Sequence, residues 1–352
     1  MTAVSIHAIN PLADSRWDDL IARHPKASVF HQRAWLEASS RTYGYEPVVF
    51  TSSAPGTQIK DGLLFCHVKS WLTGNRIVSL PFSDHCEPIC DSTSELNSLI
   101  SGLQPVLHQQ HWQYFELRPV SEDFSEVCRL QGFQPMGRYF LHVMDLGPDL
   151  DALFRSLDKD SVRRRVNRAE RDRLIERCGT SEKLLKDFYG LFVITRSRHG
   201  LPPPPYAWFL NLTHSHGNAL EIRLAYKNDR AIAAILTLHF ERTGYFKYGC
   251  SDPQFKKSGV TPWLLWNAIV AAKSRGAIRF DLGRTEEENK GLLAFKNHWV
   301  RQNKQLTYWR YSPTPSLDVA SGWKLKVAKS IFSLMPHRVL VASGKFAYRH
   351  IG

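Results

Sequence analysis

The sequence predicts an α/β (α+β) protein that consists of two similar domains in tandem. Residues 114–118 (YFELR) precede a short helical segment and a strand at 139–146. In the same way, residues 279–284 (RFDLGR) precede a short helical segment and a strand at 307–311. Gly147 and Pro148 break the chain between the two halves. We therefore expect a duplicated domain with a boundary near Gly147, and a coincidence of common elements is the alternative.

In the first half, helical periodicity alternates with runs of Val, Ile, Leu and Phe. Gly132 marks the end of the last helical segment. Helices are expected at residues 17–21, 31–40, 94–108 and 124–131, and strands at 47–51, 61–71, 76–80, 114–118 and 138–146.

The second half begins with a charged segment, residues 149–177, which we expect to form a helix. A proline-rich turn at 201–205 separates the next helix from a strand meander. Further helices are expected at 181–198, 261–275 and 289–299, and strands at 220–226, 231–240, 245–250, 278–282 and 305–311. The expected domains are 1–147 and 148–312, followed by a tail at 313–352.

The composition describes a globular protein with an excess of positive charge. Apolar residues make up 43% of the chain, which is inconsistent with a disordered segment. Lys and Arg number 46 against 33 Asp and Glu, which gives a net charge of +13. Such an excess favours an anionic partner, either phosphates, a nucleic acid or a membrane surface. A solvated basic surface explains it equally simply.

The cysteines indicate neither a disulfide framework nor a standard metal motif. There are six Cys and no CxxC pair. His85, Cys86 and Cys90 have an unusual spacing for zinc and lack a second ligand pair, so we expect ordinary loop cysteines and no metal. The first residues have no apolar core of a signal peptide, and no run approaches the ~18 apolar residues of a spanning helix. We expect a cytoplasmic protein.

The most informative stretch runs from Tyr245 to Lys296, where a strand leads into a basic, glycine-bearing loop and then into a helix. Backbone N–H groups at a helix N-terminus, with two lysines beside them, suit a phosphate or pyrophosphate. Thr261 would cap the helix and Pro262 would occupy its first position. An ordinary basic turn is the alternative. The candidate donor-binding residues are Lys256, Lys257, Ser258, Gly259, Val260 and Thr261.

The tail from residue 320 to 352 carries six basic residues and no acidic one. Trp323, Val327, Ile331 and Leu334 form an apolar stripe at helical spacing, and Pro336 ends it. A basic amphipathic helix of this kind can lie on an anionic membrane surface or pack on the protein itself. The first option would place the protein at the inner face of the membrane.

Several phrases in the second half resemble tandem GNAT-fold proteins of the FemAB/FemX-like group. They are RRRVNRAE at 163–170, RHGLP at 198–202, KYGCSD at 247–252, FDLGR at 280–284 and FK at 295–296. The resemblance implies two GNAT-like domains, each with a mixed, mostly antiparallel twisted sheet flanked by helices. It also implies that an acyl or aminoacyl group is transferred onto an amine of a cell-envelope, peptidoglycan or exopolysaccharide precursor. The second domain would hold the donor site.

The resemblance implies acyl-CoA or aminoacyl-tRNA as the donor, and the sequence departs from both patterns. GNAT proteins that use CoA carry Gln/Arg-x-x-Gly-x-Gly/Ala, whereas Lys256 and Thr261 occupy the outer positions here. The long helical arm of some members, associated with tRNA, is absent. The identity of the donor therefore stays open.

The candidate catalytic residues are Lys296, Asp281, His199 and Tyr248. The resemblance makes Lys296 a site lysine that stabilises developing negative charge, and a solvated lysine is the alternative. Asp281 would orient the acceptor amine or accept its proton, or pair with Arg284. His199 would act as a general base because its pKa lies near neutrality, or it is a hydrogen-bonded loop residue. Tyr248 would protonate a leaving thiolate, or it is a packed strand residue.

Arg164, Arg168 and Arg284 are the candidate residues for binding acceptor phosphate. Arg164 and Arg168 share one helix face, and arginine suits bidentate contacts with phosphate. A solvated, salt-bridged face is the alternative. At the level of the whole chain, the alternative to an acyltransferase is a non-catalytic basic module that binds nucleic acid or an anionic membrane.

Overall fold

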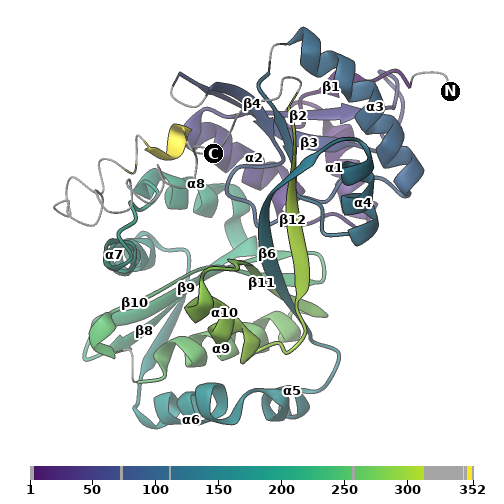
Figure 1. Ribbon diagram of the computed structural model, residues 1–352. Helices are drawn as coiled ribbons and strands as arrows, with labels where there is room; N and C mark the ends of the chain where they lie inside the picture. The colour runs from purple at the N-terminus through teal and green to yellow at the C-terminus, as the bar shows by residue number, and fades with distance from the viewer. Residues whose placement is uncertain are drawn as a thin grey trace. The chain divides into compact units, whose positions relative to one another are not determined.

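The computed structural model describes residues 4–71, 74–110, 112–255, 258–312, 344 and 347–350. They form two compact units (Figure 1). Unit 1 comprises the described residues up to Tyr139 together with 305–312 and 347–350, and unit 2 comprises those from Phe140 to Lys304 together with residue 344. The expected boundary at Gly147 thus falls within unit 2, and the strand expected to end the second domain lies in unit 1.

Unit 1 is a mixed sheet with helices. The strands follow the order β1-β2-β3-β4-β5-β12. All recorded neighbours are antiparallel except β4 and β5, which are parallel and are joined through helix α3. The elements are β1 (His7–Ile9), α1 (Ser15–Arg23), α2 (Arg33–Tyr43), β2 (Glu46–Thr51), β3 (Leu63–Ser70), β4 (Gly74–Val78), α3 (Thr93–Gln109), β5 (Phe115–Leu117), α4 (Glu122–Leu130), the start of β6 (Gln134–Asp145) and β12 (Lys304–Tyr311).

Unit 2 repeats this plan, with the strand order β11-β10-β9-β8-β7. Its neighbours are antiparallel except β10 and β11, which are parallel and are joined through helix α9. The elements are α5 (Leu150–Ser156), a π-helical turn η2 (Lys159–Arg163), α6 (Arg164–Arg171), β7 (Ile175–Gly179), α7 (Glu182–Arg198), α8 (Tyr206–His216), β8 (Leu220–Lys227), β9 (Arg230–Phe240), β10 (Thr243–Ser251), α9 (Val260–Ser274), β11 (Arg279–Glu286) and α10 (Lys290–Asn297).

Helices cover both faces of the unit 2 sheet (Figure 1). On one face, α6 and α9 bury Val166, Leu264 and Ile269 together with β-strand residues such as Ile235. Complete burial of an aliphatic side chain of this size stabilises the fold by about 1.5–3 kcal/mol. On the other face, α7 and α8 bury aromatic residues, and their Phe188 and Phe209 rings meet edge to face. The packing fixes α9 against the sheet and so fixes where its N-terminus lies.

The predicted class is confirmed: the chain is a mixed α/β protein of two tandem units. The single helix expected at 149–177 is wrong, because the chain leaves the helix at Leu157 and restarts it. There the Asp158 carboxylate accepts hydrogen bonds from the backbone N–H groups of Asp160 and Ser161. The segment then turns at Arg173, whose φ is 50°, into strand β7. The sequence reading also missed β1 and α8.

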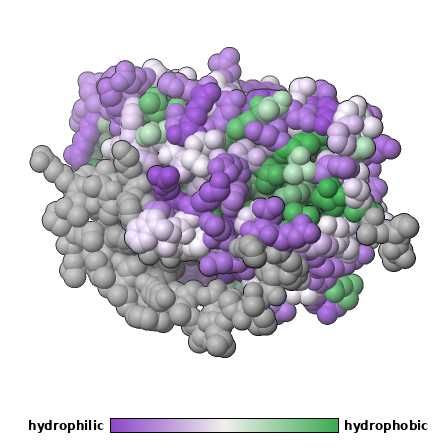
Figure 2. Space-filling model, turned by 90° about the horizontal axis from the view of Figure 1, so that it is seen from above, coloured by the Kyte–Doolittle hydropathy of each residue, from purple (hydrophilic) through white to green (hydrophobic). Residues whose placement is uncertain are grey.

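The described surface is mainly hydrophilic on the side shown in Figure 2, where apolar side chains form one larger area and a few smaller groups. Within the described ranges, no helix combines the length and the apolar character that crossing a membrane requires. The same residues contain no group of three His, Cys, Asp or Glu placed to hold a metal ion. Most of the predicted amphipathic tail, including its apolar stripe, lies outside the described residues.

Candidate active site

Strands β10 and β11 pair with each other only where they begin. The register starts at Thr243↔Arg279 and ends at Tyr245↔Asp281, and no pair beyond it is recorded for the described residues. On its other edge, β10 shifts register against β9 between Phe246 and Tyr248. Such a bulge bends a strand and increases its twist. The backbone of β10 after Tyr245 therefore parts from β11 and leaves main-chain polar groups facing the gap.

Lys296 projects from α10 to the edge of this gap. Its ammonium donates hydrogen bonds to the carbonyl oxygens of Gly283 (2.8 Å) and Arg284 (2.9 Å) in β11. Gly283 has a φ of 74°, a conformation that favours glycine, and this turns the local backbone out of regular strand geometry. The side chain is only 3% exposed, so a positive charge is buried beside β11. A solvated lysine is excluded at this position.

Asp281 is buried at the last position of β11 that pairs with β10. Its Oδ1 accepts a hydrogen bond from the Gly283 N–H at 2.6 Å. Arg284 is partly exposed and lies 3.9 Å from a carboxylate oxygen of Glu286. Asp281 and Lys296 thus both fix the backbone at Gly283: Asp281 accepts a hydrogen bond from the Gly283 N–H, and Lys296 donates one to the Gly283 carbonyl.

Two residues that the sequence reading did not select complete this cluster. His142 of β6 is fully buried, and its Nε2 lies 2.8 Å from Oδ1 of Asn297 in α10. Burial lowers the pKa of His142, the Asn297 contact opposes this effect, and the nearby Lys296 ammonium lowers the pKa further. The lowered pKa favours the neutral imidazole. A lone histidine on a strand has no spacing signal that could have revealed it.

Helix α9 begins beside the gap with an uncapped N-terminus. Gly259 is the N-cap, its φ is 79°, and no side chain caps the helix. Thr261 was expected to cap it and does not, because the helix already starts at the buried Val260. The Ser258 hydroxyl is already engaged, since it donates to the Phe255 carbonyl at 2.6 Å. Backbone N–H groups of the first turn therefore remain for an anion.

The glycine at position 259 is required by close packing as well as by its backbone angle. A Cβ atom there would lie 2.3 Å from the carbonyl oxygen of Arg165 in α6. The loop before α9 thus rests directly on the arginine-rich helix. Lys256 and Lys257, the two loop lysines of the prediction, lie outside the described residues.

The remaining candidate side chains differ in how far they are exposed to solvent. Arg164 and Arg168 are exposed on α6, and Arg164 pairs with Asp160 at 2.6 Å. This ion pair agrees with the salt-bridged alternative for Arg164. Both side chains point away from the core residues Val166 and Ala169 of the same helix.

Tyr248 and His199 differ in how firmly they are held. The Tyr248 hydroxyl accepts a hydrogen bond from Trp208 Nε1 (2.9 Å), and its ring packs edge-on against Phe192 and Phe209. His199 ends α7 and is exposed. Partial loss of hydration of the ring, followed by the positive charges of Arg198 and Arg196, lowers its pKa.

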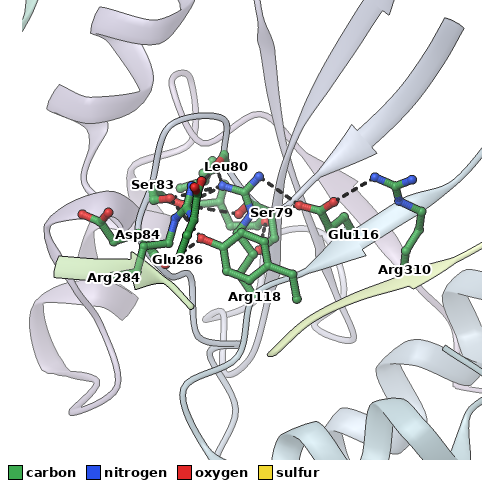
Figure 3. A network of polar contacts seen from close by, with 11 residues as sticks. Ser79, Leu80, Ser83, Asp84, Glu116, Arg118, Arg284, Glu286 and Arg310 are labelled. Atoms are coloured by element: carbon green, nitrogen blue, oxygen red, sulfur yellow. Dashed lines mark hydrogen bonds and ion pairs between the residues drawn. The ribbon is translucent and has the colours of Figure 1, made fainter. Parts of the chain in front are cut away.

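Unit 1 contains the equivalent parallel pair, β4 and β5, but the segment that follows β4 remains hydrogen-bonded to β5 and to Arg118 (Figure 3). The Ser79 N–H donates to the Glu116 carbonyl at 2.8 Å, and the Arg118 guanidinium donates to the Leu80 (2.6 Å) and Ser83 (3.2 Å) carbonyls. Leu80 has a φ of 62°, a strained value for a branched side chain. The segment after β4 thus fills the place that is open after Tyr245 in β10.

The helix that follows β4 is also unlike α9. Its N-cap Ser92 accepts the Glu95 N–H, and the Glu95 carboxylate accepts the Asp91 N–H at 2.8 Å. The first turn of α3 is therefore capped and negatively charged, which disfavours a phosphate. Of the two units, only unit 2 combines parted strands with an uncapped helix in the described part of the chain.

Comparisons with known proteins concern the fold in which this candidate site lies. Residues 158–296 match the family model described as "Acetyltransferase (GNAT) domain". A sequence search among curated proteins gave no match. Among solved structures, "Crystal structure of FemX" has a TM-score of 0.67 at 14% identity, covering 85% of this chain and 95% of that chain.

Two further solved structures have the same fold. The C-terminal domain of a putative lysylphosphatidylglycerol synthetase from Agrobacterium fabrum has a TM-score of 0.57 at 12% identity, covering 96% of this chain and 98% of that chain. A tandem GNAT protein from the clavulanic acid biosynthesis pathway has a TM-score of 0.54 at 8% identity, covering 89% and 100%. At these identities the likeness concerns the fold.

Proposed function

Because this chain has the tandem GNAT fold of FemX-like proteins, we propose that it is a transferase that moves an acyl or aminoacyl group from an anionic donor onto an amine. The observation that carries the proposal is the parting of β10 and β11 beside the uncapped N-terminus of α9. It supports a donor whose phosphates meet the helix while its acyl group lies between the strands.

The chemistry needs one bond to form and one to break at the acyl carbon. A neutral amine attacks the carbonyl, the C–N bond forms, and the carbonyl oxygen becomes negatively charged. A main-chain N–H of β10 beyond Tyr245 would donate to that oxygen, since fixed donors stabilise charge that develops in the transition state. The bond to the leaving thiolate or ribose oxygen then breaks, and the leaving group takes up the proton that the amine releases.

Each candidate side chain has a proposed part in this step. Lys296 holds the β11 backbone in place and supplies positive charge, and Asp281 orients the amine. The Tyr248 hydroxyl, oriented by Trp208, is the proposed acid for the leaving group. His199, whose pKa is lowered, is the proposed base.

Donor binding is assigned to the loop at 256–261, with its lysines, Ser258, Gly259, Val260 and Thr261. The site suits an acyl-CoA or an aminoacyl-tRNA, because both carry phosphates that backbone N–H groups can bind. Arg164, Arg168 and Arg284 are the proposed contacts for acceptor phosphate. No metal is part of the proposal.

For the acceptor, we propose an amine on a cell-envelope, peptidoglycan or exopolysaccharide precursor. The support is the fold shared with FemX and with a domain of a putative lysylphosphatidylglycerol synthetase. Peripheral contact of residues 320–352 with an anionic membrane would bring the chain close to such an acceptor.

The test is a donor panel with the purified full-length chain. Acetyl-CoA, longer acyl-CoAs and charged tRNAs are incubated with and without amine acceptors, and mass spectrometry follows loss of the acyl group. We expect one donor class to be consumed faster in the presence of the chain. Salt-dependent RNA binding without any transfer would instead favour the non-catalytic basic module.

A further inference from the structure

A separate cavity of about 600 Å³ opens in unit 1, where α4 ends and strands β6 and β12 are neighbours. None of its lining residues belongs to β10, β11 or α9. The volume lies within the range of small-molecule sites. We call it the β6–β12 pocket, and its lining residues are Arg129, Phe133, Gln134, Pro135, Arg138, Gln305, Thr307 and Trp309.

The strand pleat explains why these side chains meet. Alternate residues of a strand point to the same face, so Gln134 and Arg138 of β6 share a face, as do Gln305, Thr307 and Trp309 of β12. The opposite face is occupied by Tyr139 and Tyr308, whose ring centroids are 4.4 Å apart. The pocket face therefore presents amide, hydroxyl and guanidinium groups from two adjacent strands.

The two arginines of the pocket differ in their charge balance. Arg129 is held by Glu126, with its Nε 2.8 Å from that carboxylate. Arg138 is exposed, and no ion pair is recorded for it among the described residues. Arg138 is thus the side chain that can accept an anionic group, and arginine binds carboxylate or phosphate through two parallel hydrogen bonds.

The pocket also has an apolar part. Phe133 and Trp309 form its buried wall, with exposed fractions of 1% and 8%, and the Nε1 atom of Trp309 is buried without a hydrogen-bond partner. Met136 shares the strand face with Gln134 and Arg138 and is 40% exposed, and Leu130, next to Arg129 in the chain, is 69% exposed. An exposed apolar group beside a polar pocket suggests a ligand with one apolar face.

We propose that the β6–β12 pocket binds a pyranose sugar that carries a carboxylate or a phosphate. Arg138 binds the anionic group, and Gln134, Gln305 and Thr307 bind ring hydroxyls, because amides and hydroxyls both donate and accept. The exposed Met136 side chain, which lies beside the pocket on the strand face of Gln134 and Arg138, covers the apolar C–H face of the ring. The site does not depend on the proposed transfer reaction, because binding is measured without a donor.

Four probes test the proposal by NMR: glucuronate, glucose 1-phosphate, glucose and inorganic phosphate. The indole N–H signal of Trp309 is assigned with Trp309→Phe in the full-length chain. Glucuronate, glucose 1-phosphate or both should shift it saturably, and whichever binds identifies the anionic group. Glucose and phosphate alone should bind at least about tenfold more weakly, since each lacks one half of the contacts.

Arg138→Gln should weaken binding of the anionic sugar by about ten- to a hundredfold, as expected for loss of a charged hydrogen bond. Arg41→Gln is the matched control, because Arg41 is an exposed arginine of unit 1 that pairs with Glu37 away from the pocket. Unchanged affinity in Arg138→Gln overturns the proposal. So does a Trp309 signal that none of the probes moves, or one that glucose moves as readily as glucuronate.

Discussion

Lys296 is a charged side chain in a position where charge is rarely tolerated. Lysines are seldom buried without a partner, and here two main-chain carbonyls supply it. The same contacts hold β11 in its irregular path at Gly283. Lys296 therefore both fixes the backbone of β11 beside the gap between β10 and β11 and places a positive charge there.

Lys296→Met should lower the free energy of unfolding by about 1–3 kcal/mol, because two buried carbonyls lose their donor. It should also abolish transfer. Lys290→Met is the control, since Lys290 is exposed on the same helix and should stay within about 0.5 kcal/mol of the wild type. Urea denaturation and a transfer assay check both variants. Wild-type turnover by folded Lys296→Met would remove Lys296 from the mechanism.

His216 should make stability depend on pH. Burial lowers its pKa from 6.5 to about 4, and its contact with the Leu212 carbonyl opposes this only partly. Between pH 6.5 and about 4 the unfolded chain binds the proton and the folded chain does not. Stability is therefore full above pH 6.5 and falls on acidification, by at most about 1.4 kcal/mol per pH unit for this group.

The measurement is thermal unfolding of wild type and variants at pH 7 and pH 5. His216→Gln should reduce the loss of stability at pH 5, because the titrating group is gone. His214→Gln should keep it, since His214 is exposed on the same helix. Equal pH dependence in all three proteins would contradict the assignment. His31 is buried with a pKa of about 4 and supplies part of the remaining dependence.

At the residue scale, the sequence led to Lys296 and Asp281 as candidates, but it could not predict what surrounds them. A lysine in a helix of mixed composition normally indicates a solvated side chain, and only the fold reveals that Lys296 is buried. His142 and Asn297 are far apart in the chain and belong to no motif, so their meeting depends on tertiary structure.

Helices α3 and α9 hold equivalent places after the first parallel strand of each unit, yet their first turns differ. Ser92 and Glu95 close the first turn of α3, whereas Gly259 leaves the first turn of α9 open. This contrast assigns the donor site to unit 2 in our proposal. The sequence predicted α9 within one residue at each end, because its apolar run and the preceding glycine are strong local signals.

Gly259→Ala should remove donor binding, because its Cβ would meet the Arg165 carbonyl and displace either the loop or α6. Gly276→Ala is the matched control at the other end of α9. Gly276 has a φ of 86°, so alanine there brings similar backbone strain of about 1 kcal/mol, but nothing lies within 4 Å of its Cβ. Donor titration followed by thermal shift compares the two variants. Equal donor affinity in both would argue against a donor at this loop.

The segment 149–177 shows where element prediction failed. Its charge pattern is helical throughout, but Asp158 caps a new helix, and Ile175 pairs with Tyr226 of β8. Strand pairing is a long-range interaction, and a highly charged strand at the edge of a sheet lacks the apolar alternation that identifies strands.

The excess of positive charge belongs to the whole molecule, and it makes donor binding sensitive to salt. Affinity for the donor should fall as salt rises from 50 to 200 mM. If the protein contacts six to ten phosphates of the donor, its affinity would fall by about 10³–10⁵-fold over this range, and the affinity for a small nucleotide donor would fall much less. Equilibrium titrations at several salt concentrations therefore distinguish tRNA from CoA. Affinity independent of salt would contradict phosphate-led binding.

The sequence indicated the duplication, but it did not indicate that the last strand, β12, belongs to the sheet of unit 1. Local pattern correctly indicates a strand near 305–311, but it cannot identify the partner of that strand. In the structure Trp309 pairs with Leu117 and Tyr311 with Phe115, which adds β12 to the sheet of unit 1.

This membership of β12 has a consequence for biosynthesis. The edge of β5 that pairs with β12 has no partner strand until residues 304–311 have left the ribosome. By that time all strands of unit 2 have been synthesised. The buried Glu116 carboxylate also lacks one of its ion-pair partners until then, because Arg310, which lies 3.3 Å from it in the folded protein, belongs to β12. An isolated fragment 1–147 would keep an unpaired strand edge and a half-paired buried carboxylate, and both promote aggregation or misfolding. Unit 1 is thus the first to be synthesised and the last to be completed.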